Sequence, residues 1–128
     1  MMKLLLVEDS ELIRYRLVDW LRSLSAAIQI DTAITIDQTL EQVRSRQPDL
    51  LILDLSLPDG NAIHKIEEFK ALAPHMGIAI FTNDASNFTR VKCLFAGADW
   101  FFDKSSEVNE LIALVQQQLS ARIGNPAN

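Results

Sequence analysis

The chain has 128 residues, 48% of them hydrophobic and 23% charged, which suits one folded domain and excludes a second domain of ordinary size. Twelve Lys and Arg against 17 Asp and Glu give a net charge of −5, so the chain lacks the basic footprint of a nucleic-acid binder. The single cysteine, Cys93, excludes an internal disulfide and a multi-cysteine metal site. No signal-peptide core or membrane-length apolar stretch occurs, so we expect a soluble, cytoplasmic protein.

Short apolar runs alternate with helical patterns along the chain. Five strands are predicted, at residues 4–7, 28–33, 50–53, 78–81 and 100–102. A helix is predicted after each strand: the first is capped by Ser10, the second begins near Asp37, and the fourth covers about residues 86–96. Five strand–helix units with short connections predict a parallel sheet with helices on both faces.

Polar residues follow four of these strands. Glu8 and Asp9 follow the first strand, Asp54 the third and Thr82 the fourth, and Lys104 ends the fifth. Sites in parallel sheets of this type form at the carboxyl ends of the strands. We therefore expect three carboxylates, one hydroxyl and one ammonium to meet in one crevice.

These residue types together have a specific chemistry. Crowded carboxylates repel one another unless a cation is present, and Mg²⁺ prefers oxygen ligands. A carboxylate can attack phosphorus to form an aspartyl phosphate, while Thr82 donates a hydrogen bond to the phosphoryl group and Lys104 pairs with its charge. Each residue alone has an ordinary explanation as a solvated strand end, turn or surface group; their combination indicates a site that holds a phosphoryl group.

The residues around this site form motifs of a known family. They are LVED at 6–9, LDLSLPDG at 53–60, FT at 81–82 and GADWFFDK at 97–104. With these motifs, residues 3–123 resemble the receiver domain of bacterial two-component response regulators. The resemblance implies a doubly wound, flavodoxin-like (βα)5 three-layer sandwich with parallel strand order 2-1-3-4-5. We expect the receiver domain to fill residues 1–123 and residues 124–128 to form a flexible tail.

The resemblance also implies roles for individual residues. Asp54 is the expected phosphoacceptor, phosphorylated by a sensor histidine kinase or a histidine phosphotransfer protein. The expected Mg²⁺ ligands are Asp9, Asp54, the Ser56 backbone carbonyl and, through water, Glu8. Thr82 and Lys104 are the expected phosphoryl-sensing pair, and Phe101 matches the aromatic switch position, which we expect to turn inward after phosphorylation.

The sequence departs from the family pattern near the site. Ser105 follows Lys104 where many receivers have proline, and the switch residue Phe101 has no hydroxyl. Asn83 replaces a smaller residue and is expected to slow phosphoryl exchange. Ser56 and Asp84 flank the site, and we expect both to tune dephosphorylation, Asp84 by orienting a water.

Other expectations concern partners and packing. The resemblance implies a downstream protein target and a homodimer through the fourth helix, fifth strand and fifth helix, with no enzymatic activity beyond self-phosphotransfer and autodephosphorylation. From charge and hydropathy we expect no nucleic acid and no membrane among the partners. The alternatives are a receiver fragment of a longer regulator, a binding-only pseudo-receiver, and an Mg²⁺-dependent phosphatase with an Asp nucleophile. The last needs a second acid where Ser56 stands. Helical spacing places Trp20 in the core, and it favours core packing for most of a set of apolar residues near the fourth helix: Phe88, Val91, Phe95 and Trp100. The alternative for this set, implied by the resemblance, is a partner or dimer face.

Overall fold

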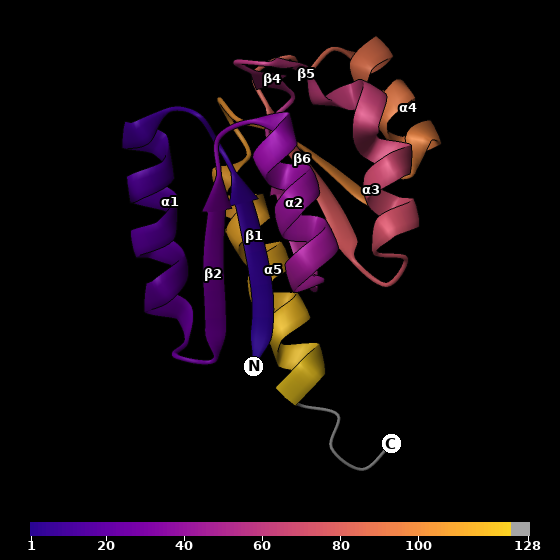
Figure 1. Ribbon diagram of the computed structural model, residues 1–128. Helices are drawn as coiled ribbons and strands as arrows, with labels where there is room; N and C mark the ends of the chain where they lie inside the picture. Colours follow the sequence, from indigo (N-terminus) through magenta and orange to yellow (C-terminus); the bar gives the residue numbers. More distant parts are fainter. Residues whose placement is uncertain (124–128) are drawn as a thin grey trace.

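A five-stranded parallel sheet forms the centre of the molecule in this computed structural model, which describes residues 1–123 (Figure 1). Its strands lie in the order β2-β1-β3-β6-β7, and their bounds are β1 (Met2–Val7), β2 (Ile28–Ala33), β3 (Leu50–Leu53), β6 (Gly77–Thr82) and β7 (Trp100–Asp103). Numbered by predicted strand, this order is 2-1-3-4-5, so the expected flavodoxin-like topology is confirmed. The predicted tail at 124–128 lies outside the described residues.

Five α-helices cover the two faces of the sheet (Figure 1). They are α1 (Glu11–Leu24), α2 (Ile36–Arg46), α3 (Ile66–Leu72), α4 (Asn87–Ala96) and α5 (Val108–Ile123). Leu51 and Leu53 of β3 pack on the side of α2, α3 and α4, whereas Leu50 and Ile52 pack on the side of α1 and α5. Because β3 is buried on both faces, each of its four positions is apolar.

Capping side chains fix where the helices begin and end. The Ser10 hydroxyl accepts a hydrogen bond from the Ile13 amide at 3.3 Å, which confirms the predicted cap of α1. Ser86 caps α4 in the same way. Gly97 ends α4 at a φ of 121°, a backbone angle that favours glycine.

One small element was not expected. After Asp54, a two-stranded antiparallel hairpin pairs β4 (Ser56–Leu57) with β5 (Gly60–Asn61), and Gly60 takes a φ of 141°. A 3-10 turn, η1 (Ala62–Lys65), then leads into α3. Strands of two residues are too short to produce an alternating pattern in the sequence.

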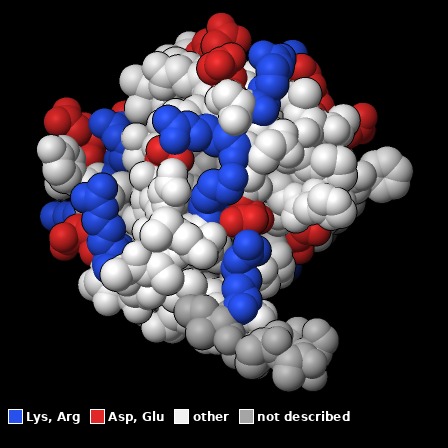
Figure 2. Space-filling view, turned by 60° about the horizontal axis from the view of Figure 1, so that its bottom comes forward, with Lys and Arg blue, Asp and Glu red and all other residues white. Residues whose placement is uncertain are grey.

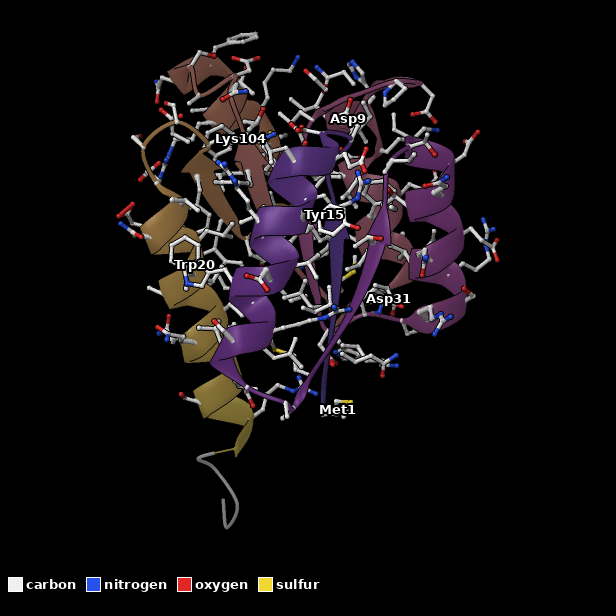
Figure 3. The ribbon with its side chains drawn as sticks, turned by 90° about the vertical axis from the view of Figure 1, so that its left-hand side faces the viewer. Met1, Asp9, Tyr15, Trp20, Asp31 and Lys104 are labelled. Carbon is white, nitrogen blue, oxygen red and sulfur yellow. The ribbon has the colours of Figure 1, made fainter. Side chains whose placement is uncertain are left out.

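Two packing predictions are wrong. Trp20 remains 39% exposed at the edge of the helical face that Leu17 and Leu21 bury, and Figure 3 shows it beside α5. On α4, Phe88, Val91 and Phe95 are exposed instead of packed in the core. Helical spacing gives residues a common face, but neighbouring elements must also cover that face, and here they do not.

The amino ends of the strands form a surface that carries charges of both signs. Figure 2 shows several groups of Lys and Arg side chains across this lower face, with Asp and Glu side chains between them. Lys3 Nζ donates to the Arg46 carbonyl at 2.8 Å, and Arg122 Nη2 lies 3.3 Å from Asp49 Oδ1. Helices α2 and α5 end here, so cations in their last turns lie near the negative ends of the helix dipoles. Within residues 1–123, no helix is long and apolar enough to cross a membrane.

Candidate functional site

Three carboxylates meet at the carboxyl ends of β1 and β3. These strands pair in register up to Val7 and Leu53, so the residues that follow them, Glu8 and Asp54, lie side by side. Oxygens of Glu8, Asp9 and Asp54 all lie within 4.8 Å of one another. Glu8 and Asp54 are buried, whereas Asp9 is exposed. The structure thus brings together the carboxylates that the sequence placed at one edge of the sheet.

Lys104 is the cation of this cluster. Its Nζ lies 2.8 Å from Asp54 Oδ2 and 2.6 Å from Glu8 Oε1, and its side chain is only 8% exposed. Burial by itself lowers the pKa of Lys104, but the hydrogen bonds and charges of Asp54 and Glu8 outweigh burial and raise this pKa above its ordinary value. The ammonium therefore stays charged and holds the two buried carboxylates together. Figure 3 shows Lys104 and Asp9 at the same end of the molecule.

The backbone on both sides fixes this arrangement. Glu8 Oε2 accepts a hydrogen bond from the Ser10 amide at 3.0 Å, and Arg14 Nη1 donates to the Glu8 carbonyl at 2.9 Å. The Lys104 amide donates to the Thr82 carbonyl at 2.9 Å, which joins the ends of β6 and β7. Glu8 was expected to act mainly through metal-bound water; its direct partner in the structure is Lys104.

The donor set of the cluster fits a divalent cation. Three carboxylates and one ammonium leave a formal charge of 1 − 3 = −2 in a largely buried space. Carboxylate oxygens are preferred ligands of Mg²⁺, which commonly retains water as well. Asp9, which is exposed, lies where a hydrated ion can reach the cluster.

Thr82 is linked to α4 through Asp84. The buried Thr82 hydroxyl accepts a hydrogen bond from the Asp84 amide at 3.2 Å. The Asp84 carboxylate in turn accepts hydrogen bonds from the Ser86 hydroxyl at 3.2 Å and the Thr89 hydroxyl at 2.9 Å. Both carboxylate oxygens therefore bind the start of α4.

Phe101 already faces the interior. Its side chain is 5% exposed and belongs to the core beneath α2, α3 and α4. The Arg90 guanidinium lies 5.7 Å from the centre of its ring. We expected this ring to turn inward after phosphorylation, so any such switch begins from a ring that is already buried. The peptide bond between Lys104 and Ser105 is trans.

Sequence reasoning missed one contact beside the site. Asp59 lies in the loop between Asp54 and η1, and its carboxylate oxygens accept hydrogen bonds from the Ile36 and Asp37 amides at 2.8 and 3.1 Å. These bonds lower the Asp59 pKa below its ordinary value. They join the loop after Asp54 to the start of α2. No sequence signal singles out Asp59 for this contact, because every helix begins with amides that lack helical partners; the cap of α2, Thr35, satisfies the Gln38 amide.

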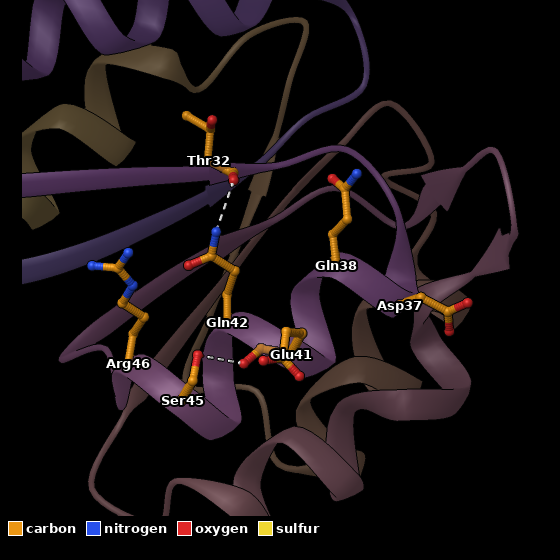
Figure 4. A pocket seen from close by; sticks show the side chains of 7 residues that line it. All are labelled: Thr32, Asp37, Gln38, Glu41, Gln42, Ser45 and Arg46. Atoms are coloured by element: carbon orange, nitrogen blue, oxygen red, sulfur yellow. Dashed lines mark hydrogen bonds between the residues drawn. The ribbon is translucent and has the colours of Figure 1, made fainter.

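An open pocket of about 680 Å³ lies beside β2 and α2 (Figure 4). Gln42 Nε2 contacts the Thr32 carbonyl at 3.4 Å, and the Ser45 hydroxyl donates to the Glu41 carbonyl at 2.8 Å. These are local contacts of one helix and an edge strand. The pocket contains none of the predicted site residues, so its size does not make it the functional site.

Comparisons with known proteins agree on one family. The family model described as the response regulator receiver domain matches residues 4–116. The transcriptional activator DevR/DosR of Mycobacterium tuberculosis is 29% identical over 116 residues, covering 91% of this chain and 54% of the relative. The KDP operon transcriptional regulatory protein KdpE of Escherichia coli K12 is 31% identical over 124 residues, and the alignment covers 93% of this chain and 52% of the relative. The chain thus spans about half the length of these relatives.

A solved structure shows the same fold. It is a response regulator from Burkholderia pseudomallei with a phosphorylated aspartic acid, a calcium ion and citrate. The TM-score is 0.81 at 22% identity, and the alignment covers 98% of this chain and 76% of that one. At this identity the likeness supports the fold, while the local site geometry must be judged from the residues described above.

Proposed function

The chain belongs to the family of response regulator receiver domains, and on that premise we propose that it is a signalling switch that accepts a phosphoryl group on Asp54. The observation that carries the proposal is the position of Asp54, buried at the end of β3 and 2.8 Å from Lys104 within a cluster of three carboxylates. The neighbour from Burkholderia pseudomallei carries a phosphorylated aspartic acid and a calcium ion, which supports the same chemistry here.

The transfer needs few protein groups. An oxygen of Asp54 attacks the phosphorus of a phosphohistidine on a histidine kinase or phosphotransfer protein; the new O–P bond forms as the N–P bond breaks, and the imidazole takes up a proton. Asp9, Asp54, the Ser56 carbonyl and, through water, Glu8 would hold Mg²⁺, which supplies positive charge against the phosphoryl oxygens. Asp9 offers its carboxylate from the solvent side.

Thr82 and Lys104 then detect the product. A phosphoryl group adds about −1.5 to −2 charge, and charge-assisted hydrogen bonds are worth roughly 1.5–3 kcal/mol each. Two such bonds give about 3–6 kcal/mol, comparable with the ~5.5 kcal/mol that moves an equilibrium from 1:99 to 99:1. As the Thr82 hydroxyl turns to the phosphoryl group, its bond to the Asp84 amide breaks, which releases the loop before α4.

Several finer assignments remain part of the proposal. Asn83 and Ser56, exposed beside the site, would set the rates of phosphoryl exchange and loss. The output partner is an unidentified protein, and the face of α4, β7 and α5 remains an expected dimer surface. The prediction of no nucleic-acid contact stays a prediction, because DevR/DosR is by name a DNA-binding activator. The alternative of a receiver fragment from a longer regulator stands beside this proposal, because the chain covers about half of such relatives.

The proposal is tested by phosphorylation with a small acyl phosphate and Mg²⁺, followed by intact mass measurement. We expect one phosphoryl group on the wild type and none on Asp54→Asn. Asp31→Asn is the matched control, because Asp31 lies on β2, far from the cluster (Figure 3), and we expect it to be phosphorylated normally. Equal labelling of wild type and Asp54→Asn would refute the assignment. Sustained release of phosphate from a phosphomonoester would instead support the phosphatase alternative.

A further inference from the structure

Helix α4 presents a row of exposed apolar side chains beside α3. Phe88 is 73% exposed, Val91 55% and Phe95 93%. Their spacing of three and four residues places them on one face of the helix. Figure 1 shows α3 and α4 as neighbours at one corner of the molecule. Soluble monomers rarely expose several large apolar groups together, and such patches mark interaction surfaces.

A groove lies next to this row. Its volume is about 310 Å³; one wall comes from η1 and α3 and the other from α4. Ile63, His64 and Glu67 line the first wall, and Val91, Lys92 and Phe95 line the second. We call this surface the α3–α4 groove. It places a fully projecting aromatic ring, Phe95, directly beside an apolar hollow.

The charges around the groove complement each other. Between Asn87 and Ala96, α4 carries Arg90 and Lys92 but no carboxylate, whereas α3 carries Glu67 and Glu68 in its first turn. Glu68 pairs with Lys65 at 3.4 Å. Among residues 1–123, Glu67 and Lys92 line the same groove without forming an ion pair. Lys92 of one molecule can therefore pair with Glu67 of another.

We propose that the α3–α4 groove binds a second copy of this chain across a two-fold axis. In a two-fold contact, one surface must complement itself. Here Phe95 of each copy would enter the partner's groove, while Lys92 of each copy would pair with the partner's Glu67. Large aromatic residues at the centre of an interface, with charges near the rim, are typical of stable contacts.

This surface differs from the dimer face expected from the family resemblance. That face comprises α4, β7 and α5, and on its side of α4 Arg90 lies over the ring of Phe101. The residues of the α3–α4 groove lie toward η1 and α3. The proposal does not require phosphorylation, so it is tested on the unphosphorylated chain without Mg²⁺, and its failure would leave the phosphoacceptor assignment standing.

The first test measures self-association by sedimentation equilibrium up to millimolar protein. We expect a reversible dimer, weakened about 30-fold by Phe95→Glu, which removes one aromatic anchor from each half of the contact. Tyr15→Glu is the matched control, because Tyr15 is an exposed aromatic residue on α1 (Figure 3) and should leave association unchanged. Circular dichroism confirms that both variants fold. A chain that stays monomeric throughout, or equal loss in both variants, overturns the proposal.

The second test uses charge reversal. Glu67→Lys and Lys92→Glu should each weaken association, and the double variant should restore it, because the two charges meet across the axis. Arg90→Glu serves as the control for the other face of α4. If association is lost with Arg90→Glu but survives Phe95→Glu, or if the double reversal gives no recovery, the dimer does not use this groove.

Discussion

At the carboxyl ends of the strands, Glu8 and Asp54 bury their carboxylates against Lys104, whereas at the amino ends Arg122 pairs with Asp49 while still half exposed. Both are contacts between opposite charges. Charges removed from water lose their hydration and interact strongly with each other, while exposed charges are screened by solvent and salt. The buried ion pairs of Lys104 therefore dominate the electrostatics at the carboxyl ends of the strands. The exposed ion pair of Arg122 contributes little at the amino ends.

The buried end also carries negative charge that Lys104 does not balance. Its three carboxylates face one ammonium, so it remains poised to bind a cation and respond to added charge. At the amino ends, Lys and Arg side chains lie among acidic groups in contact with solvent (Figure 2). The following predictions test this contrast.

The largest effect is expected from Lys104→Met. This change keeps a long side chain but leaves two buried carboxylates without their cation, so we expect the free energy of unfolding to fall by about 3 kcal/mol in metal-free buffer. Urea unfolding at neutral pH measures the loss. Millimolar Mg²⁺ should recover much of it, because the ion replaces the missing positive charge. A variant as stable as the wild type would show that the ion pairs are not needed to hold the cluster.

A smaller effect is expected from Mg²⁺ on the wild type. An ion that binds only the folded state adds RT ln(1 + [Mg²⁺]/Kd) to stability, or about 1.4 kcal/mol at ten times Kd. Asp9→Asn removes the exposed carboxylate of the cluster and should lose most of this gain. Thermal unfolding with Mg²⁺, and with an added sodium salt at equal ionic strength, separates binding from screening. Equal stabilisation of both proteins would argue against a site at Asp9.

Alkaline pH should remove the contribution of Lys104 gradually. Its pKa is raised above the ordinary 10.5 in the folded state, so the stabilisation is complete below the unfolded value and is lost as pH rises toward the folded one. Burial raises the Cys93 pKa to about 11, which also reduces stability between about pH 9 and 11. This second effect occurs in wild type and Lys104→Met alike. The difference in unfolding free energy between the two proteins should therefore shrink above pH 10.5, and a constant difference would contradict the ion-pair account.

Much of this contrast was accessible from the sequence. The all-apolar run of β3 predicts a strand buried on both faces, and parallel strands bring their carboxyl ends together, so Asp54 and Lys104 were expected to meet although 50 residues separate them. The contact of Asp59 with the start of α2 was not predictable in this way, because one Asp in a turn serves equally well as a local turn residue. The exposure of Phe95 was also hidden, since its helical spacing is the same whether or not another element covers it.

The smallest effect is expected at the exposed end. Arg122→Met breaks the ion pair with Asp49, whose atoms lie 3.3 Å apart. The arginine side chain is 49% exposed, so we expect a loss below about 1 kcal/mol in urea unfolding. Added salt should reduce this loss further, because salt screens an exposed pair more strongly than a buried one. If Arg122→Met cost as much stability as Lys104→Met, burial would not be what distinguishes the two ends, and the strong interactions at the carboxyl ends would need another cause.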